Sequence, residues 1–429
     1  MKQFKDVLVI GLALFAMFFG AGNLIFPPYI GILSGSKWYM SLFGFLLTGI
    51  GLPLIGIIVM SKNDGKFENF AGKVGTNFSK VLGIVIMLAI GPLLAIPRTG
   101  ATTYEMAIKP LFPNVSPIIV TAVYFAINLY LVINPSSVID KIGKILTPVL
   151  LAMLAIIIAK GIISPIGQPV ITNITNPFSK AFAEGYQTMD ALASTVFAGI
   201  IISSVVAKGY SNTKDQIKLT LLSGVIAACG LLMVYGGLMY LGATASGIFS
   251  SDISKTQLTI AITQNLLGNF GKIALGIAVG FACLTTSVGL TATAGEFFSN
   301  LTNNKISYKT VVIIVTLFSA VVSNFGVETI VKLAVPLLVT VYPVVIVLII
   351  LNIFDEFIKN KNSYLYAVYL TLIISIVDGL SAIGINLKGV QALISKLPFA
   401  KSNFAWILPA LIGVLIPLLF GKKHSGQTE

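Results

Sequence analysis

Charged residues are scarce in this chain. Only 10% of its 429 residues are Asp, Glu, Lys or Arg, whereas an average soluble domain has about a quarter. Hydrophobic residues make up 56%, and the mean hydropathy is +0.95. A chain of this composition would expose too much apolar surface to water, so it indicates an integral membrane protein that crosses the bilayer as helices.

Histidine and cysteine are nearly missing as well. The one histidine, His424, lies in the terminal tail, which excludes a histidine proton relay within the membrane. Cys229 and Cys283 lie in separate apolar segments, and we interpret them as small core residues, not as a disulfide or a metal pair. The chain also has no nucleophile–base pair, phosphate loop or metal-ligand cluster, so we expect that it is not an enzyme.

The net charge of +13 does not indicate a nucleic-acid-binding protein, because no polar stretch is available to form such a domain. Most lysines lie in the short connections between apolar segments, where basic residues set the topology. With both termini in the cytoplasm, the inner connections hold the majority of these lysines. We therefore predict that both termini are cytoplasmic.

Apolar segments long enough to span a bilayer recur along the whole chain, and there are about twelve of them. No linker divides them, so we predict a single all-α membrane domain over residues 1–429. The segments lie at about 6–33, 38–60, 79–108, 116–135, 141–164, 186–209, 216–242, 270–301, 310–325, 329–352, 365–383 and 404–421. The outer connection 243–269 has the pattern of a short helix lying across the outer surface, either as a gate or lid or as a surface helix without a gating role.

The first segment is interrupted by Gly-Ala-Gly-Asn at residues 20–23, and Pro27 and Pro28 close the interrupted stretch. Glycine tolerates non-helical backbone angles, and proline cannot donate a backbone hydrogen bond. Unwound backbone at membrane depth is tolerated only where it is buried in protein or lines a cavity. A break here would free amides that suit a carboxylate and carbonyls that suit a small cation. The alternative is a kinked, tightly packed helix that binds no ligand.

The eighth segment carries three consecutive hydroxyls, at Thr285, Thr286 and Ser287. A single hydroxyl in an apolar helix commonly bonds back to a carbonyl one turn earlier, but three in a row exceed that need. The hydroxyls of Thr285 and Thr286 and the carbonyl of Ala282 lie on nearly one side of a helix. Together with carbonyls from the broken first helix, they would form an all-oxygen site for a hard cation such as Na⁺.

Several charged residues lie within apolar segments, and two of them bear most on function, Asp190 in the sixth and Arg98 in the third. Intramembrane carboxylates are usually functional, but Asp190 could equally lie in water at the outer end of its helix. Arg98 is the only arginine of the chain, and its charge needs a partner, for which Asp190 and Glu105 are candidates. We favour an ion pair or a snorkelling side chain over direct contact with a substrate.

The chain resembles a known family, the bacterial branched-chain amino acid carriers, in three blocks: Phe15–Pro28, Gly91-Pro92 with residues 95–99, and Thr188–Leu192. The resemblance extends over essentially the whole chain. It implies a secondary active transporter in the bacterial cytoplasmic membrane that couples import of leucine, isoleucine and valine to Na⁺ by alternating access. Its partners would be the amino acid and the lipid bilayer, and we expect a monomer.

That family is similar in turn to sodium-coupled amino acid transporters of the LeuT-like fold. The similarity implies five-plus-five inverted repeats (residues 6–164 and 186–352, with accessory helices in 365–421) and breaks in helices 1 and 6. It places the sodium ion on the carbonyls of Ala16, Phe19 and Ala282 and on the hydroxyls of Thr285 and Thr286. It places the substrate near the break of the first helix and near a break in the sixth around Leu192 to Thr195, on Phe18, Gly20, Ala21, Gly22, Asn23, Leu192, Ala193, Ser194 and Thr195.

One departure from that fold affects the ion count. Some members hold a second sodium ion with an Asn from the seventh segment, but residues 216–242 contain no Asn, so we expect one sodium ion. The alternative function is a proton-coupled permease for another small neutral amino acid. A channel would need rings of pore-lining groups, and a sensor would need a soluble output domain. Neither feature is visible in the sequence.

Overall fold

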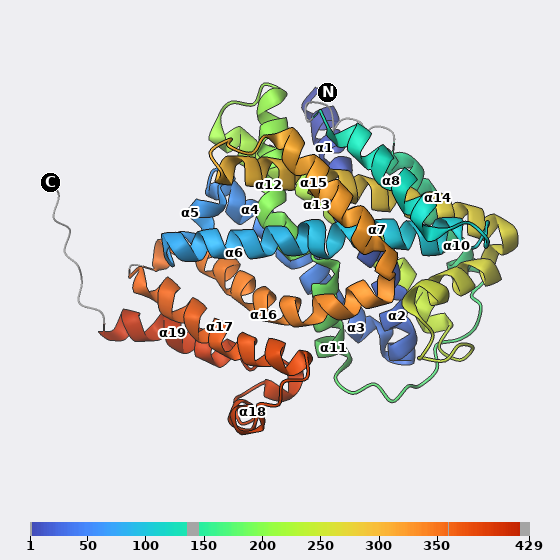
Figure 1. The fold of residues 1–429 in the computed structure, drawn as a ribbon. Helices are drawn as coiled ribbons and strands as arrows, with labels where there is room; N and C mark the ends of the chain where they lie inside the picture. The colour runs from blue at the N-terminus through green and yellow to red at the C-terminus, as the bar shows by residue number, and fades with distance from the viewer. Residues whose placement is uncertain (1, 135–145, 359, 421–429) are drawn as a thin grey trace.

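The structure is a computed structural model of the chain and describes residues 2–134, 146–358 and 360–420. Within these ranges the chain is almost entirely helical and has no β-strand (Figure 1). The α-helices are α1 (Lys2–Phe18), α2 (Ala21–Ser34), α3 (Trp38–Leu46), α4 (Leu52–Lys62), α5 (Phe67–Ala71), α6 (Thr76–Leu88), α7 (Ala95–Thr102), α8 (Pro117–Val132), α10 (Thr147–Ile163), α11 (Pro177–Glu184), α12 (Asp190–Ala207), α13 (Thr213–Thr244), α14 (Lys255–Leu301), α15 (Tyr308–Val322), α16 (Val327–Ile353), α17 (Asn362–Ala382), α18 (Lys388–Ile394) and α19 (Ile407–Phe420). Shorter helical turns join several of them: η1 (Gly35–Lys37), η2 (Leu47–Gly51), η3 (Ala89–Leu93), η4 (Thr103–Ile108), η7 (Gly185–Thr188), η8 (Ser323–Phe325), η9 (Asp355–Phe357) and η10 (Ala400–Ser402).

Each apolar segment predicted from the sequence coincides in its main part with helix, which confirms the all-α class. In the described part of the chain, eight helices are long and apolar enough to cross a membrane, and three shorter apolar helices accompany them. The count of twelve spans and the inverted repeat stay predictions. Residues 135, 141–145 and 421, at the ends of three predicted segments, and His424 lie outside the described residues.

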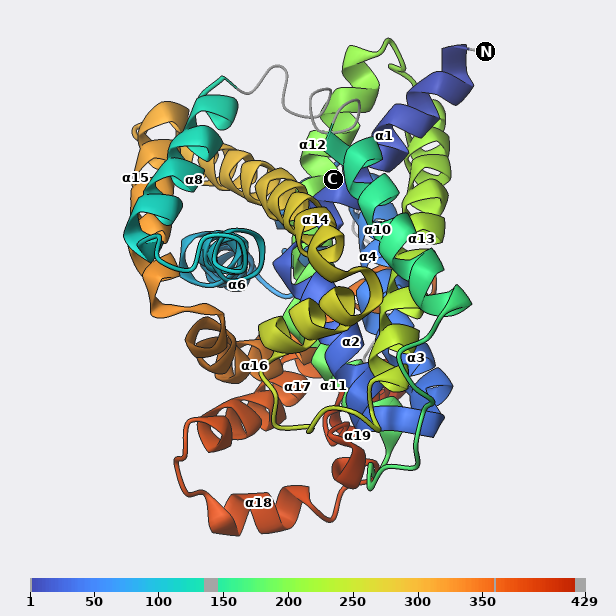
Figure 2. The same cartoon turned by 90° about the vertical axis from the view of Figure 1, so that its right-hand side faces the viewer.

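Helix α2 packs closely against α13 (Figure 2). A Cβ atom on Gly31 would lie 2.1 Å from the carbonyl oxygen of Met239, and one on Gly242 would lie 2.0 Å from that of Pro28. Small residues allow helix backbones to approach in this way, and they are typical of membrane helix interfaces. The second half of the first segment is therefore held by backbone contact with α13.

Pro27 and Pro28 lie inside α2, which continues to Ser34. The prediction that they close the interrupted stretch is therefore wrong. Proline weakens an isolated helix because it removes backbone hydrogen bonds. In a membrane protein neighbouring helices can compensate for that loss, and both prolines are buried.

Helix α14 contains the predicted outer helix as its first part. Gly268, with φ +58° and ψ −138°, kinks α14 between residues 255–267 and the long segment that follows. Glu105 forms hydrogen bonds to both α14 and α16. Its Oε2 accepts one from Thr256 Oγ1, in the first part of α14, at 3.0 Å. Its Oε1 accepts one from the amide of Val327, at the start of α16, at 2.9 Å. Glu105 is thus engaged by α14 and α16, and it forms no ion pair with Arg98 in the described ranges.

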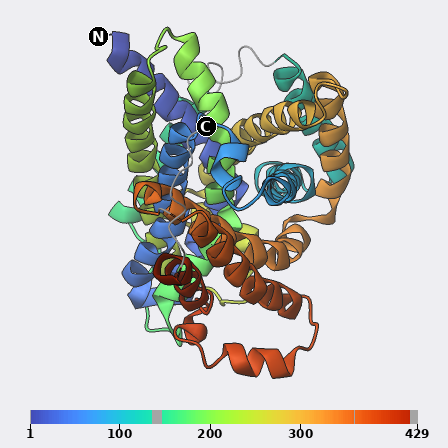
Figure 3. The same cartoon turned by 90° about the vertical axis from the view of Figure 1, so that its left-hand side faces the viewer.

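The C-terminal helices α17, α18 and α19 lie along one side of the molecule, away from the start of α1 (Figures 2 and 3). Helix α17 packs on α16, and α19 packs on α17. At the end of α16, Lys73 Nζ lies 2.7 Å from Asp355 Oδ1, which also accepts a hydrogen bond from the Tyr364 hydroxyl at 2.8 Å. This cluster joins the connection before α6 to the junction of α16 and α17.

The interpretation of the cysteines is right for one of them. Cys283 is buried, whereas Cys229 is exposed on α13, and neither forms a disulfide. An exposed apolar residue is ordinary on a membrane helix, because its outer face meets lipid. The sequence does not reveal which side of α13 faces the protein, since that helix is apolar on both sides.

Candidate functional site

The first helix is interrupted where the sequence predicted. Helix α1 ends at Phe18 and α2 begins at Ala21, with Gly20 extended between them at φ −111° and ψ −160°. The side chain of Asn23 turns back, and its Oδ1 accepts a hydrogen bond from the Gly20 amide at 3.0 Å. The amides of Ala21 and Gly22 occupy the first turn of α2, where backbone N–H groups have no acceptor within the helix. They form the positive end of α2.

The sixth helix is also interrupted, so both predicted breaks are present. The break in the sixth helix, however, lies at another residue than predicted. Met189 has φ +64° and separates η7, which ends at Thr188, from α12, which begins at Asp190. The break around Leu192 to Thr195 is therefore a wrong prediction. The hydroxyls there donate to carbonyls one turn earlier within an intact helix, at 2.7 Å for Ser194 to Ala191. Small and hydroxyl residues are compatible with a continuous helix once such bonds form.

The two breaks are joined by a buried polar network. Asn23 Nδ2 donates to Asp190 Oδ2 at 2.7 Å and also contacts the hydroxyl of Tyr235 on α13. The Tyr235 hydroxyl donates to the same carboxylate oxygen at 3.3 Å. Asp190 is 3% exposed, so it lies inside the protein and not in water at the end of the helix. From the sequence, both a buried position and a position in water were possible for Asp190.

The hydroxyls of α14 meet the end of α1. Thr285 Oγ1 donates to the carbonyls of Ala16 at 3.1 Å and Ala282 at 3.0 Å, while Thr286 Oγ1 lies 3.2 Å from the carbonyls of both Ala16 and Met17. Four of the five residues predicted to hold sodium thus lie together. The fifth, Phe19, lies in the break itself, and its amide donates a hydrogen bond to the carbonyl of Phe15 at 2.7 Å.

Arg98 approaches the break of the first helix from α7. Its side chain is 3% exposed, Nη1 donates to the carbonyl of Gln187 at 2.7 Å, and Nε has no hydrogen-bond partner among the described residues. Its guanidinium lies 5.7 Å from the ring centre of Phe26, and a Cβ on Gly22 would be 2.9 Å from Nη2. No ion pair to Asp190 or Glu105 forms among the described residues, so the expected ion pair is absent.

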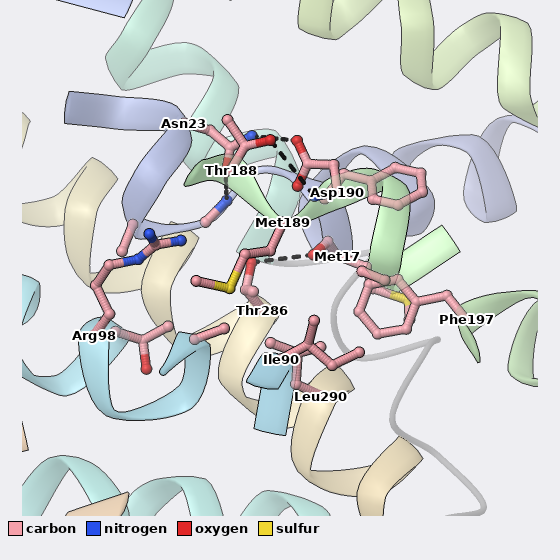
Figure 4. Close-up of a pocket in the computed structure, with 16 residues that line it drawn as sticks. Met17, Asn23, Ile90, Arg98, Thr188, Met189, Asp190, Phe197, Thr286 and Leu290 are labelled. Carbon is pink, nitrogen blue, oxygen red and sulfur yellow. Dashed lines mark hydrogen bonds between the residues drawn. The ribbon is translucent and has the colours of Figure 1, made fainter. Parts of the chain in front are cut away.

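These features surround one internal cavity (Figure 4). The free space within it is far smaller than in typical ligand pockets, which hold roughly 300–1,000 Å³. Only about 20 Å³ of it can hold the centre of a water molecule, so side chains must move apart to admit an amino acid. Its lining combines Met17, Phe18, Gly20, Ala21, Asn23, Ile90, Ala95, Arg98, Thr99, Thr188, Met189, Asp190, Ala193, Phe197, Thr286 and Leu290.

The predicted substrate residues fall into two groups around this cavity. Phe18, Gly20, Ala21, Asn23 and Ala193 line it, whereas Gly22 borders it through its contact with Arg98. The remaining three do not line it: Leu192, Ser194 and Thr195. Their placement followed from the misplaced break, because α12 begins several residues earlier than expected and turns those side chains away.

Several lining residues were not predicted from the sequence, among them those of the third segment and Leu290 of α14. Ile90, Ala95 and Thr99 lie on either side of the irregular backbone at Gly91, where φ is −90° and ψ is −124°. The Gly91-Pro92 pair was the available signal, since it breaks a membrane helix as the first block does. Leu290, by contrast, is one apolar residue in an apolar helix, so no local signal indicates it.

Two interrupted helices at a buried cavity within a multi-pass helical protein are typical of the LeuT-like fold of membrane transporters. The chain has this fold in common with a Na⁺-coupled sialic acid symporter (TM-score 0.60, 13% identity, 95% of this chain and 88% of that one). It also has it in common with MhsT in complex with L-phenylalanine (TM-score 0.56, 16% identity, 96% and 98%). Identities this low establish the fold alone.

Sequence comparison then gives the family. The profile described as "Branched-chain amino acid transport protein" matches residues 3–424, and this chain belongs to that family. It is 40% identical to the branched-chain amino acid permease BraB of Bacillus subtilis, over 96% of this chain and 94% of that one. It is 38% identical to the branched-chain amino acid transport system 2 carrier protein of Pseudomonas aeruginosa, over 98% of both chains. The protein is therefore a bacterial multi-pass membrane transporter and not an enzyme.

Proposed function

We propose that the protein is a secondary transporter that imports leucine, isoleucine and valine together with Na⁺. The observation that carries the proposal is the cavity at the two helix breaks, with the hydroxyl–carbonyl cluster of α1 and α14 beside it. Uphill import needs an energy source, and a Na⁺ gradient would supply it through an ion that binds next to the substrate and favours the loaded state.

The donor set fits a sodium ion. The carbonyls of Ala16 and Ala282 and the hydroxyls of Thr285 and Thr286 are neutral oxygens within hydrogen-bond distance of one another. Hard cations prefer oxygen ligands, whereas transition metals prefer imidazole or thiolate. Each hydroxyl now donates to a carbonyl, and it would turn a lone pair to the ion instead. We expect Phe19 to supply the fifth oxygen.

The cavity lining fits a branched aliphatic side chain. Ile90, Phe197 and Leu290 offer apolar surface, and Met17 and Met189 add flexible side chains that can move apart. Burial is worth about 0.8 kcal/mol per CH₂ group, so the pocket should favour leucine, isoleucine and valine over alanine. One methylene changes selectivity only about 10–200-fold, so discrimination among the three should be modest.

The free amides of Ala21 and Gly22 would bind the substrate carboxylate, because they form the positive end of α2. The substrate ammonium would then lie between the carbonyl of Phe18 and the start of α12. In LeuT-like transporters such half-helix ends are the usual ion and substrate sites. The same reasoning predicts that the side chains of the break matter mainly through the shape they permit.

Uptake of labelled isoleucine into proteoliposomes tests the proposal. An inward Na⁺ gradient should drive accumulation, and removing the gradient or replacing Na⁺ with K⁺ should abolish it. Accumulation driven by an inward proton gradient without Na⁺ would support a proton-coupled permease instead. That alternative has one observation in its favour, the buried Asp190 carboxylate held by Asn23 and Tyr235.

Asp190→Asn separates the two coupling mechanisms. The proposed sodium site is complete without Asp190, so this variant should retain Na⁺-driven uptake even where its affinity for isoleucine falls. If the variant binds isoleucine normally but its uptake no longer depends on any ion, Asp190 carries the coupling ion.

A further inference from the structure

Arg98 is a buried cation that forms no ion pair in the described structure. Its side chain is 97% buried, and its one hydrogen bond there goes from Nη1 to the carbonyl of Gln187. A guanidinium has five N–H donors, and the buried Nε has no partner. A buried charge left uncompensated is costly, so an arginine in this position needs an anion.

No carboxylate of the described residues forms an ion pair with Arg98. Glu105 is held by Thr256 and Val327, and Asp190 is held by Asn23 and Tyr235. Figure 4 shows Arg98 and Asp190 on different sides of the cavity. The two charges thus face the same cavity but stay separate.

The guanidinium lies beside the positive end of α2. A Cβ atom on Gly22 would be 2.9 Å from Nη2 and 3.3 Å from Cζ, so the Gly22 backbone and the guanidinium are in close contact. An anion that accepts hydrogen bonds from the first-turn amides of α2 therefore lies within reach of Arg98. A planar guanidinium can bind a carboxylate through two parallel hydrogen bonds.

We propose that Arg98 binds the α-carboxylate of the transported amino acid together with the N-terminus of α2. This inference rests on the proposed function, because it takes the cavity as the amino acid site. It assigns Arg98 a direct role in selecting a free carboxylate, in place of the ion pair that the sequence suggested. The Phe26 ring of α2 lies beside the guanidinium as well, with its centre 5.7 Å from Cζ.

The test is calorimetric binding of isoleucine and of isoleucinamide, which lacks the negative charge, to purified protein in sodium buffer. The native protein should prefer isoleucine. In Arg98→Gln, isoleucine affinity should fall about 10–100-fold, while isoleucinamide should bind as before or more tightly, because a positive charge facing it has gone. A merely structural Arg98 would weaken both ligands in parallel, and that result would overturn the proposal.

Lys255→Gln is the matched control. The Lys255 ammonium lies 5.8 Å from the same Phe26 ring, on the side of an outer pocket that it lines with Tyr29. It is a cation at a similar distance from that ring but does not line the cavity. Its substitution should leave the preference for isoleucine over isoleucinamide unchanged, and a loss of preference equal to that of Arg98→Gln would also contradict the proposal.

Arg98→Lys covers the case in which Arg98→Gln does not fold. Lysine retains the charge but not the planar pair of donors, so isoleucine should bind more weakly and still be preferred over isoleucinamide. Loss of that preference with the charge retained would overturn the proposal. If the native protein binds no isoleucine at all, the proposed function fails together with this inference, whereas an unchanged preference in Arg98→Gln overturns the inference alone.

Discussion

At the scale of single residues, Thr286 links the first helix to α14. Its hydroxyl lies 3.2 Å from the carbonyls of Ala16 and Met17. Thr286→Ala removes one proposed ligand oxygen, so the Na⁺ concentration for half-maximal isoleucine uptake should rise several-fold. Thr293→Ala is the control, because that hydroxyl lies on the same helix but donates to the carbonyl of Gly289. Unchanged sodium dependence in both Thr285→Ala and Thr286→Ala would rule out the proposed site.

Gly22 is the residue of the first break where shape matters most. An added Cβ would meet the Arg98 guanidinium at 2.9 Å and the Phe26 ring at 3.2 Å. Gly22→Val should therefore abolish isoleucine binding, although it adds only apolar atoms to an apolar segment. Ala21 already has a Cβ, so Ala21→Ser should weaken isoleucine binding far less than Gly22→Val. Normal binding by Gly22→Val in calorimetry would mean that this break is structural and that the substrate site lies elsewhere.

At the scale of elements, the contact between α2 and α13 depends on glycine. A Cβ on Gly242 would lie 2.0 Å from the carbonyl oxygen of Pro28, a backbone atom that cannot turn away. Gly242→Ala should lower stability by about 1–3 kcal/mol, the usual cost of overpacking. Gly280→Ala in α14 is the control, since nothing lies within 4 Å of its added Cβ. Thermal unfolding in detergent measures both, and equal midpoints would contradict the close packing of α2 on α13.

The cluster at the junction of α16 and α17 predicts a pH dependence. Partial burial alone would raise the pKa of Asp355, but hydrogen bonds from Lys73 and Tyr364 outweigh it and lower that pKa. The ionised carboxylate is therefore favoured by folding, and its contribution to stability is lost as the pH falls through the lowered pKa. Asp355→Asn should lower the unfolding midpoint slightly at pH 7, and the gap from the native protein should close towards pH ~3, below the usual Asp pKa.

Glu356→Gln is the control for that measurement. Glu356 is the exposed neighbour of Asp355 and has no ion pair in the described ranges. Its substitution should leave the midpoint unchanged across this pH range. A gap between native protein and Asp355→Asn that stays constant from neutral to acidic pH would show that the carboxylate charge contributes nothing.

At the scale of the whole molecule, the orientation in the membrane is a prediction that reporter fusions can test. Lys208 Nζ lies 3.5 Å from Asp6 Oδ1, so the start of α1 and the end of α12 lie on the same face. From the lysine distribution we predict that this face and both termini are cytoplasmic. A fluorescent protein fused to the C-terminus should therefore fluoresce, and alkaline phosphatase fused there should be inactive. The opposite pattern, with an active phosphatase, would reverse the orientation.

The sequence alone determined the class of the protein, the run of helices and the break of the first helix. These depend on local chemistry: long apolar segments can only be membrane helices, and Gly-Ala-Gly-Asn weakens a helix wherever it stands. The pairing of Thr285 and Thr286 with Ala16 was likewise predictable through the family resemblance. The residues at both places match those of the sodium site in the LeuT-like fold.

Tertiary structure decided the rest, because it depends on which distant segments meet. The break of the sixth helix falls at Met189, a residue with no intrinsic preference for left-handed backbone, and the small residues after it form intact helix. The partners of Arg98, Asp190 and Glu105 come from other helices, so no spacing along the chain could assign them. Only the packing of α2, α7 and α12 around one cavity places the guanidinium next to the free amides of α2.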